Sequence, residues 1–242
     1  ENPEMAPARR QASTEKNRLY LVLSSVMIFL AISVVGTVYY FKSNQKIQVQ
    51  EEAKALVTFN QESKVLVASS TRESLVQRIL SDRNTFTMPA NSVLYINTSD
   101  ASGDPIPAEM FLSKISPHIP GDLARAFDGK YMFGMLSYDT NAAFMILKTS
   151  SYDIAYSGML RWEKGMIDDL GRIFSLPENM MGTEASFVDE EFNNRDLRVL
   201  RDNDGKQVLL YTFLDKNTVI ITVNNNDLKA IIEKYTLTQQ TK

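Results

Sequence analysis

The sequence contains no cysteine, a single histidine and a single tryptophan among its 242 residues. The absence of cysteine excludes disulfide bonds, thiolate metal sites and cysteine nucleophiles. One histidine excludes any site that needs two imidazole ligands. The 26 Lys and Arg residues are slightly outnumbered by 29 Asp and Glu residues, which gives a net charge of −3. No overall positive field attracts nucleic acid, so we expect no nucleic-acid partner.

One long stretch without charge, from Leu19 to Phe41, lies between Arg18 and Lys42. As a helix it would be about 35 Å long, enough to cross a hydrocarbon core of ~30 Å. A cleaved signal peptide would have a shorter apolar region of about 7–15 residues. We therefore predict a single-pass transmembrane helix in a lipid bilayer, with Leu19 and Phe41 as the two ends of the anchor.

Basic residues flank this stretch unequally. Two follow it closely, whereas four precede it: Arg9, Arg10, Lys16 and Arg18. The positive-inside rule then predicts a cytoplasmic N-terminus and a C-terminal domain outside the cytoplasm. The expected location is therefore the cell membrane, within the cell envelope.

The remainder of the chain divides by composition. Residues 1–18 are polar and predict a disordered cytoplasmic tail. Residues 42–63 are rich in Gln, Glu, Lys and Ala and are interpreted as a stalk. Alternating and helical apolar patterns fill 64–235, which predicts one extracytoplasmic domain, and 236–242 form a polar C-terminal tail.

Strands and helices alternate in the predicted domain. The order from residue 93 is strand, helix, strand, strand, helix, strand, which is the split βαβ pattern of ferredoxin-like domains. We therefore predict an α+β fold, a ferredoxin-like (βαββαβ) ectodomain with an extra C-terminal hairpin and helix. The expected strands are 64–68, 93–97, 130–138, 142–149, 186–192, 197–201, 207–214 and 218–223, and the expected helices are 70–82, 108–127, 152–174 and 226–235.

Five segments carry a resemblance to a known family. They are 71–76, 128–134, 144–149, 158–164 and 194–200. Together they resemble a family of uncharacterised single-pass membrane proteins of small-genome, uncultivated candidate-phylum bacteria. The resemblance covers most of the predicted domain and implies an anchor followed by an ectodomain. It implies no activity and no site residues, because its motifs consist of packing and turn residues.

No specific catalytic or metal-binding motif is found in the sequence. His118 lies in a proline-flanked loop and is interpreted as a surface histidine, since no nucleophile or carboxylate is paired with it in the sequence. The turn 202–205 (DNDG) fails as an EF-hand loop, because Leu200 and Tyr211 stand where ligands are required. We expect no enzymatic activity, no cofactor and no metal site.

Met159, Trp162 and Met166 recur on one face of the predicted helix 152–174 and form the candidate interface or pocket, with a core role as the alternative. The leading hypothesis is a membrane-anchored, non-enzymatic envelope protein. Its external domain would mediate protein–protein assembly with other envelope proteins or with copies of itself, as in pilus, secretion or envelope complexes. The alternative is a binding or sensor module for a small molecule, a peptide or a cell-wall fragment.

Overall fold

The computed structural model describes residues 20–28, 30, 33–34, 36, 55–85, 87, 89–138, 141–184 and 186–240. The chain divides into two units, Glu1–Glu52 and Ala53–Lys242. The strands and the helices α2 to α6 all belong to the second unit.

The predicted transmembrane helix is contradicted. Among the residues that the structure describes, no helix is both long enough and apolar enough to cross a membrane. Leu19 and Phe41, the predicted ends of the anchor, lie outside the described residues. The predictions of a single-pass membrane protein and of its location in the cell membrane are therefore wrong.

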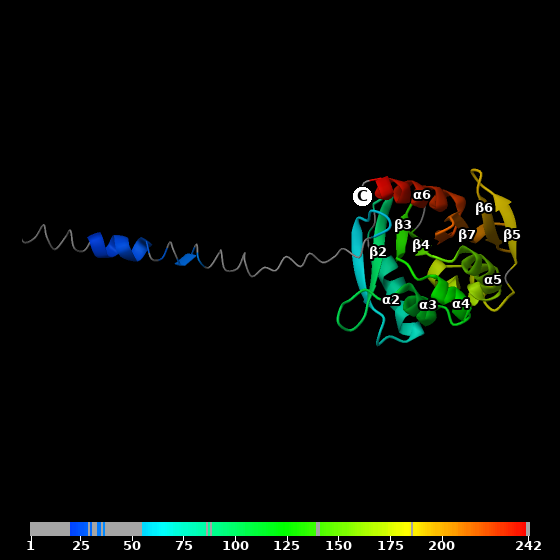
Figure 1. The fold of residues 1–242 in the computed structure, drawn as a ribbon, viewed down its shortest axis with the longest axis horizontal. Helices are drawn as coiled ribbons and strands as arrows, with labels where there is room; N and C mark the ends of the chain where they lie inside the picture. Colours follow the sequence, from blue (N-terminus) through cyan, green and yellow to red (C-terminus); the bar gives the residue numbers. More distant parts are fainter. Residues whose placement is uncertain are drawn as a thin grey trace, which may run out of the picture. The chain divides into compact units, whose positions relative to one another are not determined.

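Within the described part of the chain, eight strands form one mixed sheet in the order β1-β2-β3-β4-β8-β7-β6-β5 (Figure 1). β1 is parallel to β2, and all other neighbouring strands are antiparallel. The strands are β1 (Gln61–Leu66), β2 (Ser92–Ser99), β3 (Tyr131–Ser137), β4 (Asn141–Lys148), β5 (Phe187–Glu191), β6 (Asp196–Arg201), β7 (Gln207–Asp215) and β8 (Thr218–Thr222). Each lies within a few residues of its predicted position, and the α+β class is confirmed.

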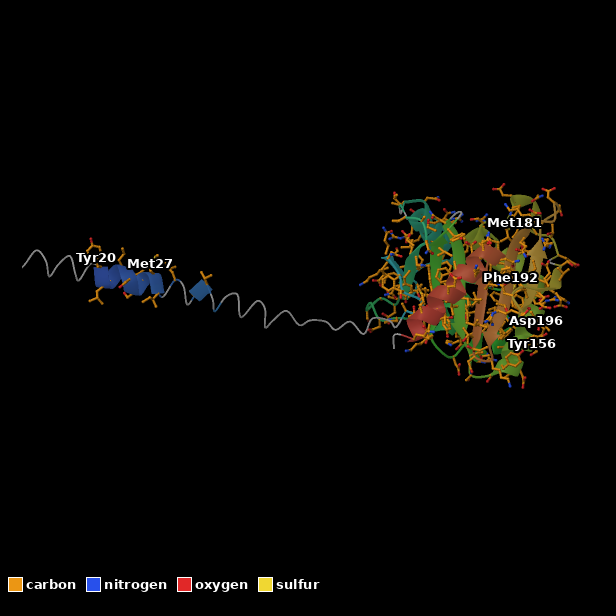
Figure 2. The ribbon with its side chains drawn as sticks, turned by 90° about the horizontal axis from the view of Figure 1, so that it is seen from above. Tyr20, Met27, Tyr156, Met181, Phe192 and Asp196 are labelled. Carbon is orange, nitrogen blue, oxygen red and sulfur yellow. The ribbon has the colours of Figure 1, made fainter. Side chains whose placement is uncertain are left out.

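Helices cover both faces of the sheet. The helices α2 to α5 pack together on one face, and α6 crosses the other face (Figures 1 and 2). Neighbouring residues of a strand point to opposite faces, so Met145 joins the core under α5 while Phe144 and Ile146 join the core under α6. The helices are α2 (Arg72–Thr85), α3 (Ala108–Ile115), α4 (Gly121–Ala126), α5 (Tyr152–Phe174), α6 (Asn225–Gln240) and the short 3₁₀ helix η1 (Glu178–Met180).

The ferredoxin-like topology is wrong. In a split βαβ unit the strands before and after the first helix run parallel, with another strand between them. Here β2 and β3, which flank α3 and α4, are adjacent and antiparallel, with Leu94 opposite Met135. The expected C-terminal hairpin is instead a set of four strands, β5 to β8, that extends the same sheet through the pairing of β4 with β8.

The domain begins before residue 64. Leu56 and Val57 are only 3% and 1% exposed and belong to the core under α6. The backbone N–H of Thr58 donates to Oγ1 of Thr238 (3.0 Å), near the end of α6. Residues 55–63 of the predicted stalk and 236–240 of the predicted tail therefore belong to the domain, whereas 1–18 and 42–54 lie outside the described residues.

We expect Leu56→Ala to lower the free energy of unfolding by about 2–5 kcal/mol, because it leaves a cavity beneath α6. The matched control is Leu66→Ala, at a side chain that is 54% exposed on β1, which should change stability by less than about 0.5 kcal/mol. Urea-induced unfolding followed by circular dichroism measures both. Equal stability of the two variants would show that residues 55–60 are not part of the folded domain.

Candidate functional site

The sequence-predicted interface residues lie inside the domain. Met159, Trp162 and Met166 are each 0% exposed and pack in the core between α5 and the sheet. An open hollow on the surface lies elsewhere, on α3, where Pro107, Glu109, Met110, Ser113 and Lys114 line it. The three predicted residues therefore offer no side-chain surface to a partner, and a binding surface has to be sought among exposed residues.

A buried carboxyl group organises the contact between α5 and the loop 116–120. Asp169 is 1% exposed, and its Oδ2 accepts a hydrogen bond from Trp162 Nε1 (2.7 Å). His118 contributes its backbone N–H (3.2 Å) and its Nδ1, which lies 2.8 Å from Oδ1. A Cβ at Gly165 would lie 2.5 Å from Cβ of His118, so glycine is what permits this approach.

The His118–Asp169 pair has the arrangement in which a carboxylate orients a histidine as a general base. A hydrolase would also need a nucleophile against the imidazole. Ser116, two residues earlier, is buried, and its hydroxyl makes no hydrogen bond in the part of the chain that is described. The imidazole makes no further hydrogen bond to the described residues. The contacts therefore fix the loop onto α5, a stabilising role that the sequence alone did not suggest for His118.

An ion-pair network joins α5 to the outer strands. Arg198 on β6 donates from Nε and Nη2 to the Glu163 carboxylate (2.8 and 2.7 Å), and the hydroxyl of Tyr211 on β7 donates to Glu163 Oε1 (2.6 Å). The hydrogen bonds to Glu163 raise the pKa of Arg198. Burial, followed by the interaction with Glu163, raises the pKa of Tyr211. Arg198 also pairs with Asp189 on β5 (2.8 Å), so the network of Glu163, Arg198, Tyr211 and Asp189 links α5 to three strands.

Three aromatic rings cluster at the start of α5. Tyr152 and Tyr156, one helical turn apart, both pack on Phe213 of β7, with ring centroids 5.1 and 5.7 Å away. The two tyrosine rings also stack on each other at 5.8 Å. Tyr156 remains 44% exposed, and the neighbouring Ile154 is 45% exposed. The cluster is therefore ordered by its own contacts while much of its surface faces solvent.

Two carboxylates lie on the two strands beyond Phe213. Glu191 on β5 and Asp196 on β6 lie directly opposite each other, and both are exposed. Neither carboxylate forms an ion pair with a described residue. The antiparallel pairing of Arg198 with Tyr211 places Asp196 beside Phe213, and Figure 2 shows Tyr156 and Asp196 on the same side of the domain. We call Tyr152, Tyr156, Phe213, Asp196 and Glu191 the β5 corner.

The sequence contained one signal for the β5 corner. Tyr152 and Tyr156 are spaced four apart and lie at the edge of the apolar face of the helix that contains Ala155 and Met159. In the acidic run 189–191 two of the three carboxylates are paired, Asp189 with Arg198 and Glu190 with Arg201. The position of Glu191 opposite Asp196 follows only from the alignment of the strands.

The two adjacent aspartates of α5 provide a test of the buried carboxyl group. We expect Asp169→Ala to lower the free energy of unfolding by about 2–4 kcal/mol, because Trp162 Nε1 and the His118 backbone N–H lose their acceptor in a buried site. Asp168→Ala, at the exposed neighbouring position, is the matched control because both changes alter helix propensity equally. The account fails if both variants unfold at the same urea concentration.

The network around Tyr211 predicts a dependence on alkaline pH. Its pKa in the folded state lies above that of the unfolded chain, about 10, so its contribution to stability is complete below pH ~10 and is lost as the pH rises further. In Tyr211→Phe the loss of unfolding free energy above pH ~10 should be less steep by about 1.4 kcal/mol per pH unit. Tyr95, whose pKa burial raises to about 12, is unchanged in both proteins. Parallel stability curves for wild type and variant would contradict this assignment.

Comparison with known proteins identifies no protein similar to this chain. No family model matches the chain, and neither the curated proteins nor the solved structures include a significant match to it. The function is therefore argued from the contacts, burial and charges of the described residues.

Proposed function

We propose that the α+β domain is a non-enzymatic protein-binding module and that the β5 corner is its contact surface. The observation that carries this proposal is the partly exposed aromatic cluster of Tyr152, Tyr156 and Phe213, in which Tyr156 is the most exposed ring. Aromatic residues are enriched in protein–protein interfaces and often dominate their binding energy. Clustered tyrosines supply a large apolar contact area together with hydroxyl groups that can form hydrogen bonds.

The packing of the cluster favours binding. Each ring is held by the other two, so few side-chain rotamers remain to be ordered when a partner arrives. Ordering a flexible side chain at an interface costs about 0.5–1.5 kcal/mol, and a preformed surface avoids much of that cost. Leu160, 37% exposed and one turn further along α5 from Tyr156, extends the apolar surface.

The charge of the β5 corner narrows the class of partner. Asp196 and Glu191 are acidic and form no ion pair among the described residues, and the chain carries a net charge of −3. A phosphate backbone would be repelled by these groups, so the partner is a protein, either another chain or a second copy of this one. The His118–Asp169 pair, the strongest candidate for catalysis, has its polar contacts accounted for by packing of the loop 116–120.

The test compares two exposed tyrosines. Tyr156 lies in the β5 corner, and Tyr138, 51% exposed, follows β3 outside it. We expect Tyr156→Ser to abolish most specific crosslinks made by the full chain in extracts of its own cells, or its self-association in sedimentation, because the central aromatic contact is lost. Tyr138→Ser should retain them and leave the unfolding free energy within about 0.5 kcal/mol of wild type. Tyr156→Ser loses two ring contacts and should lower it by about 1–3 kcal/mol, so binding is compared under conditions in which both variants are shown to be folded.

Two outcomes contradict the proposal. One is retention of the same crosslinked partners by both variants. The other is a wild-type protein that is monomeric at all concentrations and is recovered from extracts without any crosslinked partner.

A further inference from the structure

Resting on the proposed function, we further propose how the partner docks: as an added β-strand along the outer edge of β5, with basic side chains where it passes Asp189 and Glu191. In this mode, main-chain hydrogen bonds provide affinity and the alternating side chains provide specificity. The occupant is therefore an extended segment of a protein in which basic and apolar residues alternate.

The outer edge of β5 is open. β5 is the last strand in the order of the sheet and pairs only with β6 among the described strands. Val188 is 44% exposed, and the Asp189 side chain is 87% exposed, so no described element covers this edge. An open edge presents unpaired backbone N–H and C=O groups to any extended chain.

The hydrogen-bond pattern identifies which backbone groups are available. Phe192 and Arg195 exchange both of their backbone hydrogen bonds (3.0 and 3.1 Å) at the turn between β5 and β6. In an antiparallel ladder such pairs alternate with pairs that make no mutual hydrogen bonds. The register continues without a shift through Glu190 opposite Leu197, so the N–H and C=O groups of Asp189 and Glu191 point away from β6.

The side chains of Asp189 and Glu191 favour positively charged residues on the added strand. Asp189 and Glu191 share the face of the sheet on which α5 lies, because Asp189 bonds to Arg198 together with Glu163 of α5. Glu191 directly opposes Asp196, and like charges in this arrangement are destabilising. A basic side chain on an added strand would stand beside Glu191 and relieve that repulsion. Val188, on the opposite face, would meet an apolar residue.

The opposite edge of the sheet lacks this combination of an acidic strand edge and a nearby aromatic cluster. β1 is the other terminal strand, and its exposed side chains include Lys64 as well as Leu66. β1 lies at the far end of the strand order from Phe213, Tyr152 and Tyr156. Continuity with the aromatic cluster therefore selects β5.

The test uses the full chain and two fluorescent peptides of equal charge. In the first peptide Arg and Val alternate, and in the second the backbone nitrogens of a central Arg and of the adjacent Val are methylated, so that neither can donate a backbone hydrogen bond whichever way the strand runs. By fluorescence anisotropy the unmethylated peptide should bind about fivefold more tightly than the methylated peptide, the equivalent of one lost hydrogen bond. Its binding should also slow hydrogen exchange of the Asp189 and Glu191 amides.

Charge variants complete the test. Glu191→Gln should weaken binding of the unmethylated peptide about two- to fivefold, as expected for one cross-strand charge pair, whereas Asp204→Asn, at an exposed turn outside the β5 corner, should leave it unchanged. Equal binding of both peptides, equal effects of the two variants, or no binding at all would overturn strand addition. If crosslinking still depends on Tyr156 in those cases, the proposed function stands without this docking mode; if it does not, both fail.

Discussion

The carboxylate of Glu163 is the point at which the long helix is joined to the outer half of the sheet. It accepts hydrogen bonds from Arg198 and Tyr211 while the residue as a whole is only 8% exposed. Removing one member of a buried ion pair leaves an uncompensated charge, which typically costs about 3–5 kcal/mol. The β5 corner depends on this link, because Tyr156 precedes Glu163 on α5 and Asp196 precedes Arg198 on β6. The distance between the aromatic and acidic halves of the corner is therefore set by a buried contact.

The helices on the two faces of the sheet shield its central strands from solvent more completely than its edge strand β5. The inner positions of β3 and β4 are all buried, whereas β5 exposes Val188, Asp189 and Glu191 at the end of the strand order. Natural sheets usually blunt such an edge with charge. Here two of the three consecutive carboxylates are neutralised by arginines of the neighbouring strand, whereas Glu191 forms no ion pair with the part of the chain that the structure describes. In the proposed docking mode, this combination makes the edge selective for cationic partners. An edge whose carboxylates were all unpaired would mainly repel other strands.

Local patterns in the sequence predicted most elements but not their arrangement. The strands from β5 to β8 and the helix α5 lie close to their predicted positions, because alternation and helical periodicity are local properties. The sheet order depends on pairing between distant segments, such as Met145 with Ile221, and no local pattern indicates it. The start of α2 also differs from the predicted residue 70, because Oγ1 of Thr71 accepts a hydrogen bond from the backbone N–H of Ser74 and the helix begins at Arg72. The site was missed for the same reason, since the β5 corner combines one helix with three strands and His118 is 51 residues from Asp169.

The central claim is that a partner protein occupies the β5 corner and the adjoining edge. Hydrogen–deuterium exchange, measured on the full chain alone and in its crosslinked native complex, tests this most directly because it maps contact along the whole domain. The account predicts new protection in the first two turns of α5 and in β5, with exchange along α3 and its open hollow unchanged. Protection confined to α3, or exchange at β5 that is the same in the free and complexed protein, would contradict it.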